Sequence, residues 1–351
     1  MKRNASHTLA TGLLLALSVT GCQRGDDQPD PALAAASFAD APGTIWFAAE
    51  IDGATRLYSM SPASLARAVA SPDGVAYYPA PGARDIAIAV EDDGTGESHR
   101  EQLAVRAADG AWRRVGPIAP SIRNPSAAPD GSWLAFESDA ESFRDIYRVD
   151  IDTGRTTRLT RDGDGAFDPD VAPDGRRIAF VSTTSGEPQV HAMDRDGGNR
   201  ALLVDAPGQE HTPRWSPDGS AIAFAGDRDG PERLFVLDAH TGEVARATAL
   251  DRADRHEGDP VWSPDGSKLA YVVHFATGPR ELWVVSRDSS APVRVSAPEA
   301  HVVSASWSPD GAYLAYDQHT TAGRFIEIAR ADGTARTRVD IDGDAWLPRW
   351  R

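Results

Sequence analysis

A sequence repeat with a period of about 44–48 residues constrains the fold of this 351-residue chain more than any other feature. Its complete form is Trp-Ser-Pro-Asp-Gly, followed two residues later by Ile-Ala-Phe or Leu-Ala-Tyr, and it begins at Trp215, Trp262 and Trp307. Two further copies, at Ala128 and Ala172, have Ala-Pro-Asp-Gly in its place. A degenerate sixth copy surrounds Pro81, so the repeat extends over most of the chain.

The residues of the motif predict a tight turn between two antiparallel strands. Proline presets φ for the second turn residue, aspartate is tolerated at the third, and glycine accepts the strained exit. The large residues that follow alternate with alanine, as on one face of a β-strand. A third strand, such as residues 232–238, and a fourth, such as residues 156–160, complete the unit. Four short strands per repeat form one blade of a β-propeller, so the sequence predicts an all-β propeller.

The two ends of the repeat region predict how the propeller closes. Residues 44–50 and 56–60 match the second and third strands of a repeat, whereas residues 346–350 match the first. The C-terminal strand should therefore join the N-terminal blade, which removes free sheet edges. Six turn motifs and this split blade predict seven blades over residues 43–351, with six or eight as alternatives. The literal Ser-Pro-Asp-Gly at residues 71–74 is not followed by a good strand and is interpreted as part of a connection.

The repeat resembles that of TolB-like propellers, whose core is Trp-Ser-Pro-Asp-Gly followed by a Leu-Ala-Phe strand. This resemblance covers residues 43–351 and rests on five copies in register. It implies that the chain binds on one face of the propeller or at the axis. TolB docks to another envelope protein through its propeller, so the resemblance implies a docking function without carrying over that partner.

The N-terminus predicts export and lipid attachment. Lys2 and Arg3 precede an apolar run over residues 9–19, which is typical of a secretory signal peptide over residues 1–21. The sequence Val-Thr-Gly-Cys at residues 19–22 resembles a bacterial lipobox, and Cys22 is the only cysteine. An ordinary signal peptide with an unrelated cysteine is the alternative. Residues 22–42 are predicted to be the lipidated cysteine and a flexible tether.

These features predict a bacterial lipoprotein anchored to a membrane through its N-terminal lipid only, with the propeller in the periplasm. Gln23 follows the cysteine where aspartate often signals retention in the inner membrane, so the resemblance favours the outer membrane.

Charge and motifs exclude several classes of function. The formal net charge is −16 at pH 7 and no Lys/Arg cluster offsets it, which argues against nucleic-acid binding. The sequence contains no Gly-x-Ser-x-Gly motif and no cysteine besides Cys22, so it lacks the usual nucleophiles. A non-catalytic binding or scaffold function for an envelope protein or cell-wall polysaccharide is therefore favoured over an enzyme.

Three histidines are the candidate site. His211, His256 and His301 lie shortly before the inner strands of consecutive repeats, and Glu210 and Glu257 share one repeat position. Imidazoles and carboxylates that converge could bind a divalent metal, and the sequence suggests no other cofactor. Oligogalacturonate lyases are similar propellers with a His-rich metal site, which implies the alternative of a periplasmic sugar-binding protein or a metal-dependent, lyase-like enzyme. Solvated loop histidines are the simpler interpretation.

Two other patterns are interpreted as structural. The tryptophans of the repeat column, Trp215, Trp262, Trp307 and Trp350, are expected to pack between blades. The Asp-rich segments at residues 162–168 and 340–344 lack the glutamate of a calcium loop and are expected to form turns.

Overall fold

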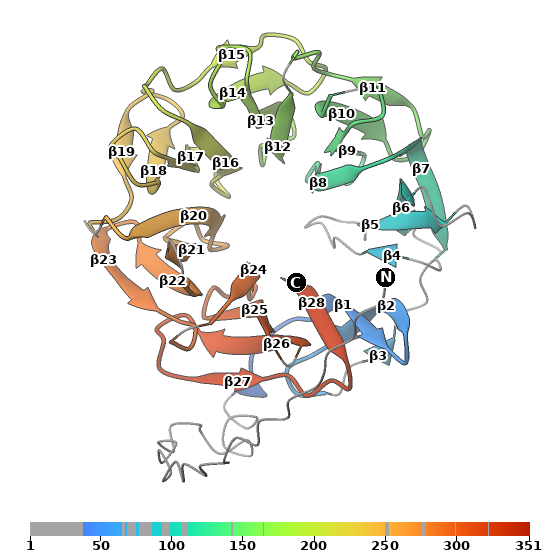
Figure 1. Ribbon diagram of the computed structural model, residues 1–351, viewed down its shortest axis with the longest axis vertical. Coiled ribbons are helices and arrows are strands. Elements are labelled where there is room, and N and C mark those ends of the chain that lie inside the picture. The colour runs from blue at the N-terminus through green and yellow to red at the C-terminus, as the bar shows by residue number, and fades with distance from the viewer. Residues whose placement is uncertain are drawn as a thin grey trace, which may run out of the picture.

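The strands among the described residues form seven four-stranded sheets, which are arranged radially around an axis (Figure 1). The computed structural model describes residues 38–64, 67–68, 75–76, 86–92, 99–106, 111–141, 143–163, 165–249, 253–275, 278–298, 300–321 and 323–351. No helical element occurs in these ranges, and none of their residues forms a helix suited to crossing a bilayer. The predicted all-β propeller is confirmed.

Each blade has its innermost strand at the axis and its outermost strand at the rim, and its strands follow in that order. The closing blade contains β28 (Asp344–Trp350), β1 (Ile45–Ile51), β2 (Ala54–Met60) and β3 (Arg67–Ala68). The next two contain β4 (Val75–Ala76), β5 (Ile86–Asp92), β6 (His99–Arg106) and β7 (Trp112–Ala119), then β8 (Ile122–Ala127), β9 (Trp133–Ser138), β10 (Asp145–Asp150) and β11 (Thr156–Arg158). In the β4–β7 sheet the description of β4 and β5 is limited to the backbone, whereas the inner strands of the other six sheets are described with their side chains.

The remaining four sheets follow the same order. They contain β12 (Ala166–Val171), β13 (Arg177–Ser182), β14 (Gln189–Asp194) and β15 (Ala201–Leu202); then β16 (Glu210–Trp215), β17 (Ala221–Gly226), β18 (Arg233–Asp238) and β19 (Val244–Arg246). The last two contain β20 (Arg255–Trp262), β21 (Lys268–Phe275), β22 (Arg280–Ser286) and β23 (Ser289–Arg294); then β24 (Val302–Trp307), β25 (Tyr313–Thr320), β26 (Gly323–Arg330) and β27 (Arg336–Arg338).

The C-terminal strand completes the N-terminal blade, as the sequence predicts. Strand β28 pairs antiparallel with β1, with Ile45 opposite Trp350 and Glu50 opposite Asp344. Backbone hydrogen bonds of 2.7 and 2.9 Å between Thr44 and Arg351 extend this pairing beyond the strands. The two ends of the described chain thus lie where the other blades have their motif turn.

The motif turns stack around one face of the ring, which we name the turn face. In the β16–β19 blade, Gly219 has φ of 71°, and a Cβ there would lie 3.2 Å from Pro173 of the preceding blade. Gly311 is placed in the same way beside Pro264. Gly43 is placed beside Pro309, so it takes the role of the motif glycine in the closing blade. The motif therefore requires glycine both for its positive φ and for close packing between blades.

The repeat tryptophans pack between blades, as expected. Trp262 and Trp307 are 7 % and 4 % exposed, and their indole nitrogens donate to the backbone carbonyls of Arg214 and Val261 in the preceding blade. Backbone amides in the same column also cross between blades: Trp215 N donates to Asp170 Oδ2 at 2.7 Å. These contacts join consecutive inner strands around the axis.

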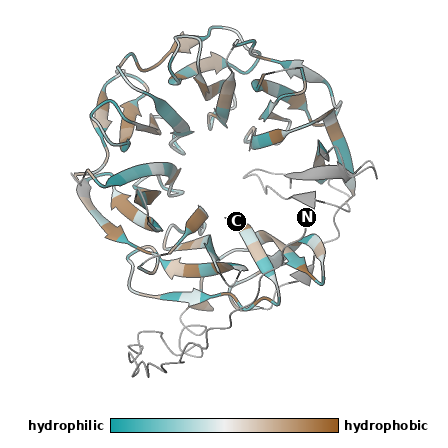
Figure 2. Ribbon diagram, viewed as in Figure 1, coloured by the Kyte–Doolittle hydropathy of each residue, from teal (hydrophilic) through white to brown (hydrophobic). Residues whose placement is uncertain are grey.

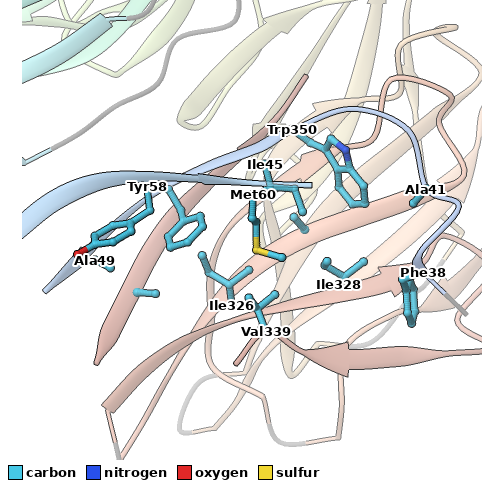
Figure 3. Packing of buried hydrophobic residues seen from close by; sticks show 13 residues of the cluster. Phe38, Ala41, Ile45, Ala49, Tyr58, Met60, Ile326, Ile328, Val339 and Trp350 are labelled. Atoms are coloured by element: carbon cyan, nitrogen blue, oxygen red, sulfur yellow. The ribbon is translucent and has the colours of Figure 1, made fainter. Parts of the chain in front are cut away.

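The segment before β1 is part of the domain core. Phe38 is 1 % exposed and packs edge to face on Tyr313, while the Trp350 indole donates to the Pro42 carbonyl at 2.7 Å. Figure 3 shows Phe38 and Trp350 in the hydrophobic cluster between the closing blade and the β24–β27 blade. The apolar side chains of Phe38 and Ala41, which precede the predicted boundary at residue 43, thus belong to this cluster.

The degenerate repeat around Pro81 lies in a segment that the structure does not describe. Pro81 lies between β4 and β5, where the other blades have the motif turn, and the literal motif at residues 71–74 precedes β4. Both segments lie outside the described residues. The predicted signal peptide, Cys22 and most of the predicted tether also lie outside them.

Candidate functional site

The face opposite the motif turns carries the connections that enter each inner strand and those that join the second strand of a blade to the third. We name it the loop face. On this face the inner strands share a bulge that sequence analysis missed. Where the inner strands are described, five of their residues have positive φ and precede a proline: Asn124, Asp168, Thr212, Asp259 and Leu347. Residues before proline normally adopt extended backbone, and positive φ is uncommon outside glycine. The repetition of this unusual geometry is therefore a common feature of these inner strands near the axis. The sequence signal is the residue–proline pair three positions before the Trp column.

Bulge residues of consecutive blades are linked to one another. Asn124 Nδ2 donates to Glu137 Oε1 at 2.7 Å and to Asp168 Oδ1 at 2.9 Å. The Thr212 amide donates to Asp168 Oδ2 at 3.3 Å, which continues the chain into the β16–β19 blade. Burial raises the pKa of the Glu137 carboxyl, and the nearby charge of Asp168 raises it further. This relay therefore fixes the bulges relative to each other.

Asp259 is the bulge residue with charged partners. Its carboxylate lies 3.2 Å from Arg280 and 3.8 Å from His274. Burial raises the pKa of Asp259, but the nearby imidazole of His274 and the charge of Arg280 outweigh it and leave the pKa below the ordinary value. Arg280 also donates from Nε to the Val302 carbonyl at 3.0 Å, and this hydrogen bond joins two blades.

The carboxylates of Glu210 and Glu257 accept hydrogen bonds from a neighbouring blade and are not free ligands. Both are 1 % exposed. The Val190 amide donates to Glu210 at 3.0 Å, and the Leu234 amide donates to Glu257 at 3.2 Å. In each case the donor is the second residue of the third strand in the preceding blade. Burial raises the pKa of Glu210.

The three predicted histidines are not equivalent in the structure. His211 lies in β16 and His256 in β20, and both are half-buried at the loop face. His256 is paired with His274 across the β20–β21 hairpin. His301 is exposed before β24, where it forms an isolated bridge with Arg280.

No group of three or more His, Cys, Asp or Glu side chains is positioned to hold a metal ion among the residues that the structure describes. A metal role for His211, His256 and His301 stays a prediction. Asp162, from one of the Asp-rich segments, is occupied by an ion pair with Arg200. The pKa of Asp162 is lowered because hydrogen bonds and charge from Arg200 outweigh burial.

The loop face also carries apolar surface and a polar–apolar asymmetry. Phe143 and Val303 are 56 % and 46 % exposed, on the β9–β10 connection and at the start of β24. Figure 2 shows that inner strand β20 is largely hydrophilic, whereas β24 is largely hydrophobic. Two neighbouring inner strands therefore differ in polarity.

This ring of four-stranded blades, whose inner strands are joined by hydrogen bonds, defines the class of protein as a β-propeller. The sequence profile of the TolB beta propeller domain matches residues 52–204 and 166–339. The chain belongs to this TolB β-propeller family.

Solved structures share the fold at low sequence identity. TolB from Acinetobacter baumannii has a TM-score of 0.58 and 20 % identity, over 84 % of this chain and 78 % of that one. An oligogalacturonate lyase in complex with manganese has a TM-score of 0.64 and 14 % identity, over 82 % and 86 %. A puromycin-hydrolysing peptidase of Mycobacterium tuberculosis has a TM-score of 0.61 and 15 % identity, over 90 % of this chain but 55 % of the peptidase. No curated protein matches the sequence.

Proposed function

We propose that this chain is a non-catalytic binding module of the bacterial cell envelope, and that its propeller docks a partner protein or a cell-wall component through the loop face. It is exported and held by a lipid on Cys22 in this proposal, with the outer membrane as the favoured site. The lipobox-like sequence at residues 19–22 supports the anchor.

The contrast between the two faces of the ring carries the proposal. On the turn face the motif aspartates are saturated by their own turns: Asp218 accepts from Ser216 and twice from Ser220, and Asp265 repeats this pattern. These hydrogen bonds lower the pKa of Asp218 and of Asp265 to about 2. The loop face instead presents half-buried imidazoles together with the exposed side chains of Phe143 and Val303. Exposed apolar groups within a polar rim are typical of an interaction surface.

We expect partner capture to depend on the loop face. Val303→Asp should abolish capture of a specific envelope component from detergent-solubilised membranes, because it places a charge in the apolar part of this face. Val303 lies at a register shift of β24, so the change leaves the strand pairing intact. Leu202→Asp on outer strand β15, where Leu202 is 40 % exposed, is the matched control and should capture normally. Equal capture by wild type and both variants would refute the loop face as the docking surface.

Periplasmic sugar binding or metal-dependent, lyase-like catalysis is the second candidate. The nearness of His256 to His274 and the fold shared with an oligogalacturonate lyase favour it. Metal content of the purified protein separates the candidates. About one bound metal per chain, lost in His256→Ala/His301→Ala, would support the second and count against a purely non-catalytic module.

A further inference from the structure

Glu232 occupies a repeated position at the loop face. Its backbone carbonyl accepts the amide of Glu257, the residue after His256 in the next blade, at 2.9 Å. The carbonyls of Arg144 and Pro188 make the same contact in their blades, at 2.8 Å each. The position therefore lies directly beside the first residues of the following inner strand.

Where this position holds an arginine, the side chain has an acidic partner. Arg280 in β22 lies two residues before buried Leu282, as Glu232 lies two residues before buried Leu234, and it pairs with Asp259. Arg144 lies 3.4 Å from Glu137. Glu232 is the acidic exception, and within the described part of the chain no hydrogen bond or ion pair reaches its carboxylate.

The surroundings of Glu232 are rich in imidazole. Its backbone contact lies beside the paired residues His256 and His274. Burial raises the pKa of the Glu232 carboxyl, whereas the imidazoles of His211 and His274 lower it. The charge of Asp259 raises this pKa and the charge of His256 lowers it, both by smaller amounts. Glu232 is thus a half-buried acceptor that is close to three imidazoles and to a second carboxylate.

We propose that Glu232 binds a protonated primary amine, namely a lysine side chain of the partner protein. An ammonium group has three donors and no acceptor, which suits a carboxylate that no hydrogen bond or ion pair reaches within the described part of the chain. Asp259 is already neutralised by Arg280, so Glu232 is the carboxylate left to attract the cation. The net charge of −16 favours approach of a basic segment. The exposed apolar side chains on the same face favour a protein over a polysaccharide.

The proposal rests on loop-face docking and is tested with a probe, the capped peptide acetyl-Gly-Lys-Gly-amide. Its titration into the full chain should shift the imidazole C2 signals of His256 and His274 saturably in NMR spectra. Glu232→Gln should weaken the apparent affinity about fivefold, the factor expected for one partly exposed ion pair of about 1 kcal/mol. Glu243→Gln makes the same change on the exposed β18–β19 turn and should leave the affinity unchanged.

Three outcomes would overturn the proposal. They are equal affinity in wild type and Glu232→Gln, an equal response to the Nε-acetylated peptide, and saturable displacement of the peptide by glucosamine, which would assign the position to an amino sugar. Partner capture separates this proposal from docking itself. If Val303→Asp abolishes capture while Glu232→Gln does not, the lysine site is refuted and the docking face stands.

Discussion

Replacing Trp350 by alanine should lower the free energy of unfolding by about 3–5 kcal/mol, the cost of removing a large aromatic side chain from a packed core. Trp350 is 6 % exposed, stacks on Tyr313 with ring centroids 6.1 Å apart, and donates to the Pro42 carbonyl. It therefore joins the last strand, the first segment and the preceding blade at the point of closure. Urea unfolding followed by tryptophan fluorescence and circular dichroism measures the loss.

Two control variants assign this loss to the closure. Trp350→Phe keeps an aromatic ring against Tyr313 but removes the indole hydrogen bond. Loss of this hydrogen bond should lower the free energy of unfolding by about 1 kcal/mol, in addition to the cost of the smaller ring. Trp346→Ala removes a half-buried tryptophan from the same strand and should cost less than Trp350→Ala. If Trp346→Ala and Trp350→Ala cost the same, Trp350 does not hold the ring closed.

Replacing His191 by phenylalanine should make the protein more resistant to acid. His191 is 8 % exposed, and neither ring nitrogen has a hydrogen-bond partner within the described residues. Burial and then the charge of Arg200 lower its pKa from 6.5 to about 4. The unfolded chain therefore binds a proton more readily, and stability falls as the pH decreases from about 6.5 to about 4. The effect is about 3 kcal/mol for a pKa difference of this size.

The repeat suggests the replacement for His191. Phe180 faces His191 across the β13–β14 pair with ring centroids 5.8 Å apart, and in the β16–β19 blade the equivalent pair is Phe224 and Phe235 at 5.7 Å. His191→Phe should therefore fit, and the difference in unfolding free energy between variant and wild type should grow as the pH falls from 7 to 4. His240→Phe on an exposed turn is the control. A difference that does not change with pH would contradict the assignment.

The sequence was sufficient for the features that recur along the chain. Pro217 and Gly219 predict a turn from local conformational preference, and the alternation after the turn predicts the strand. Closure by Trp350 follows from the phase of the repeat at the two ends. These features depend on local chemistry or on periodicity, both of which are readable without knowing the neighbouring blade.

The candidate site was harder to predict because its contacts cross between blades. Glu210 and Glu257 share a repeat position, which suggests that they accompany the histidines in a metal site, but each is buried against a backbone amide of the preceding blade. His301 precedes β24 while His256 lies within β20, although both are equally far from their motif proline. Glu232 carries no motif at all, and it stands out only when the third strands are compared by their pairing.

Closure of the ring by the last strand is the central claim, and a disulfide tests it most directly. Glu50 and Asp344 are exposed and directly opposite each other in β1 and β28. In a Cys22→Ser background, Glu50→Cys/Asp344→Cys should oxidise within one chain and migrate faster on a non-reducing gel. The off-register pair Glu50→Cys/Asp342→Cys should cross-link far less. If the first pair stays reduced, or links only between chains, the last strand does not complete the first blade.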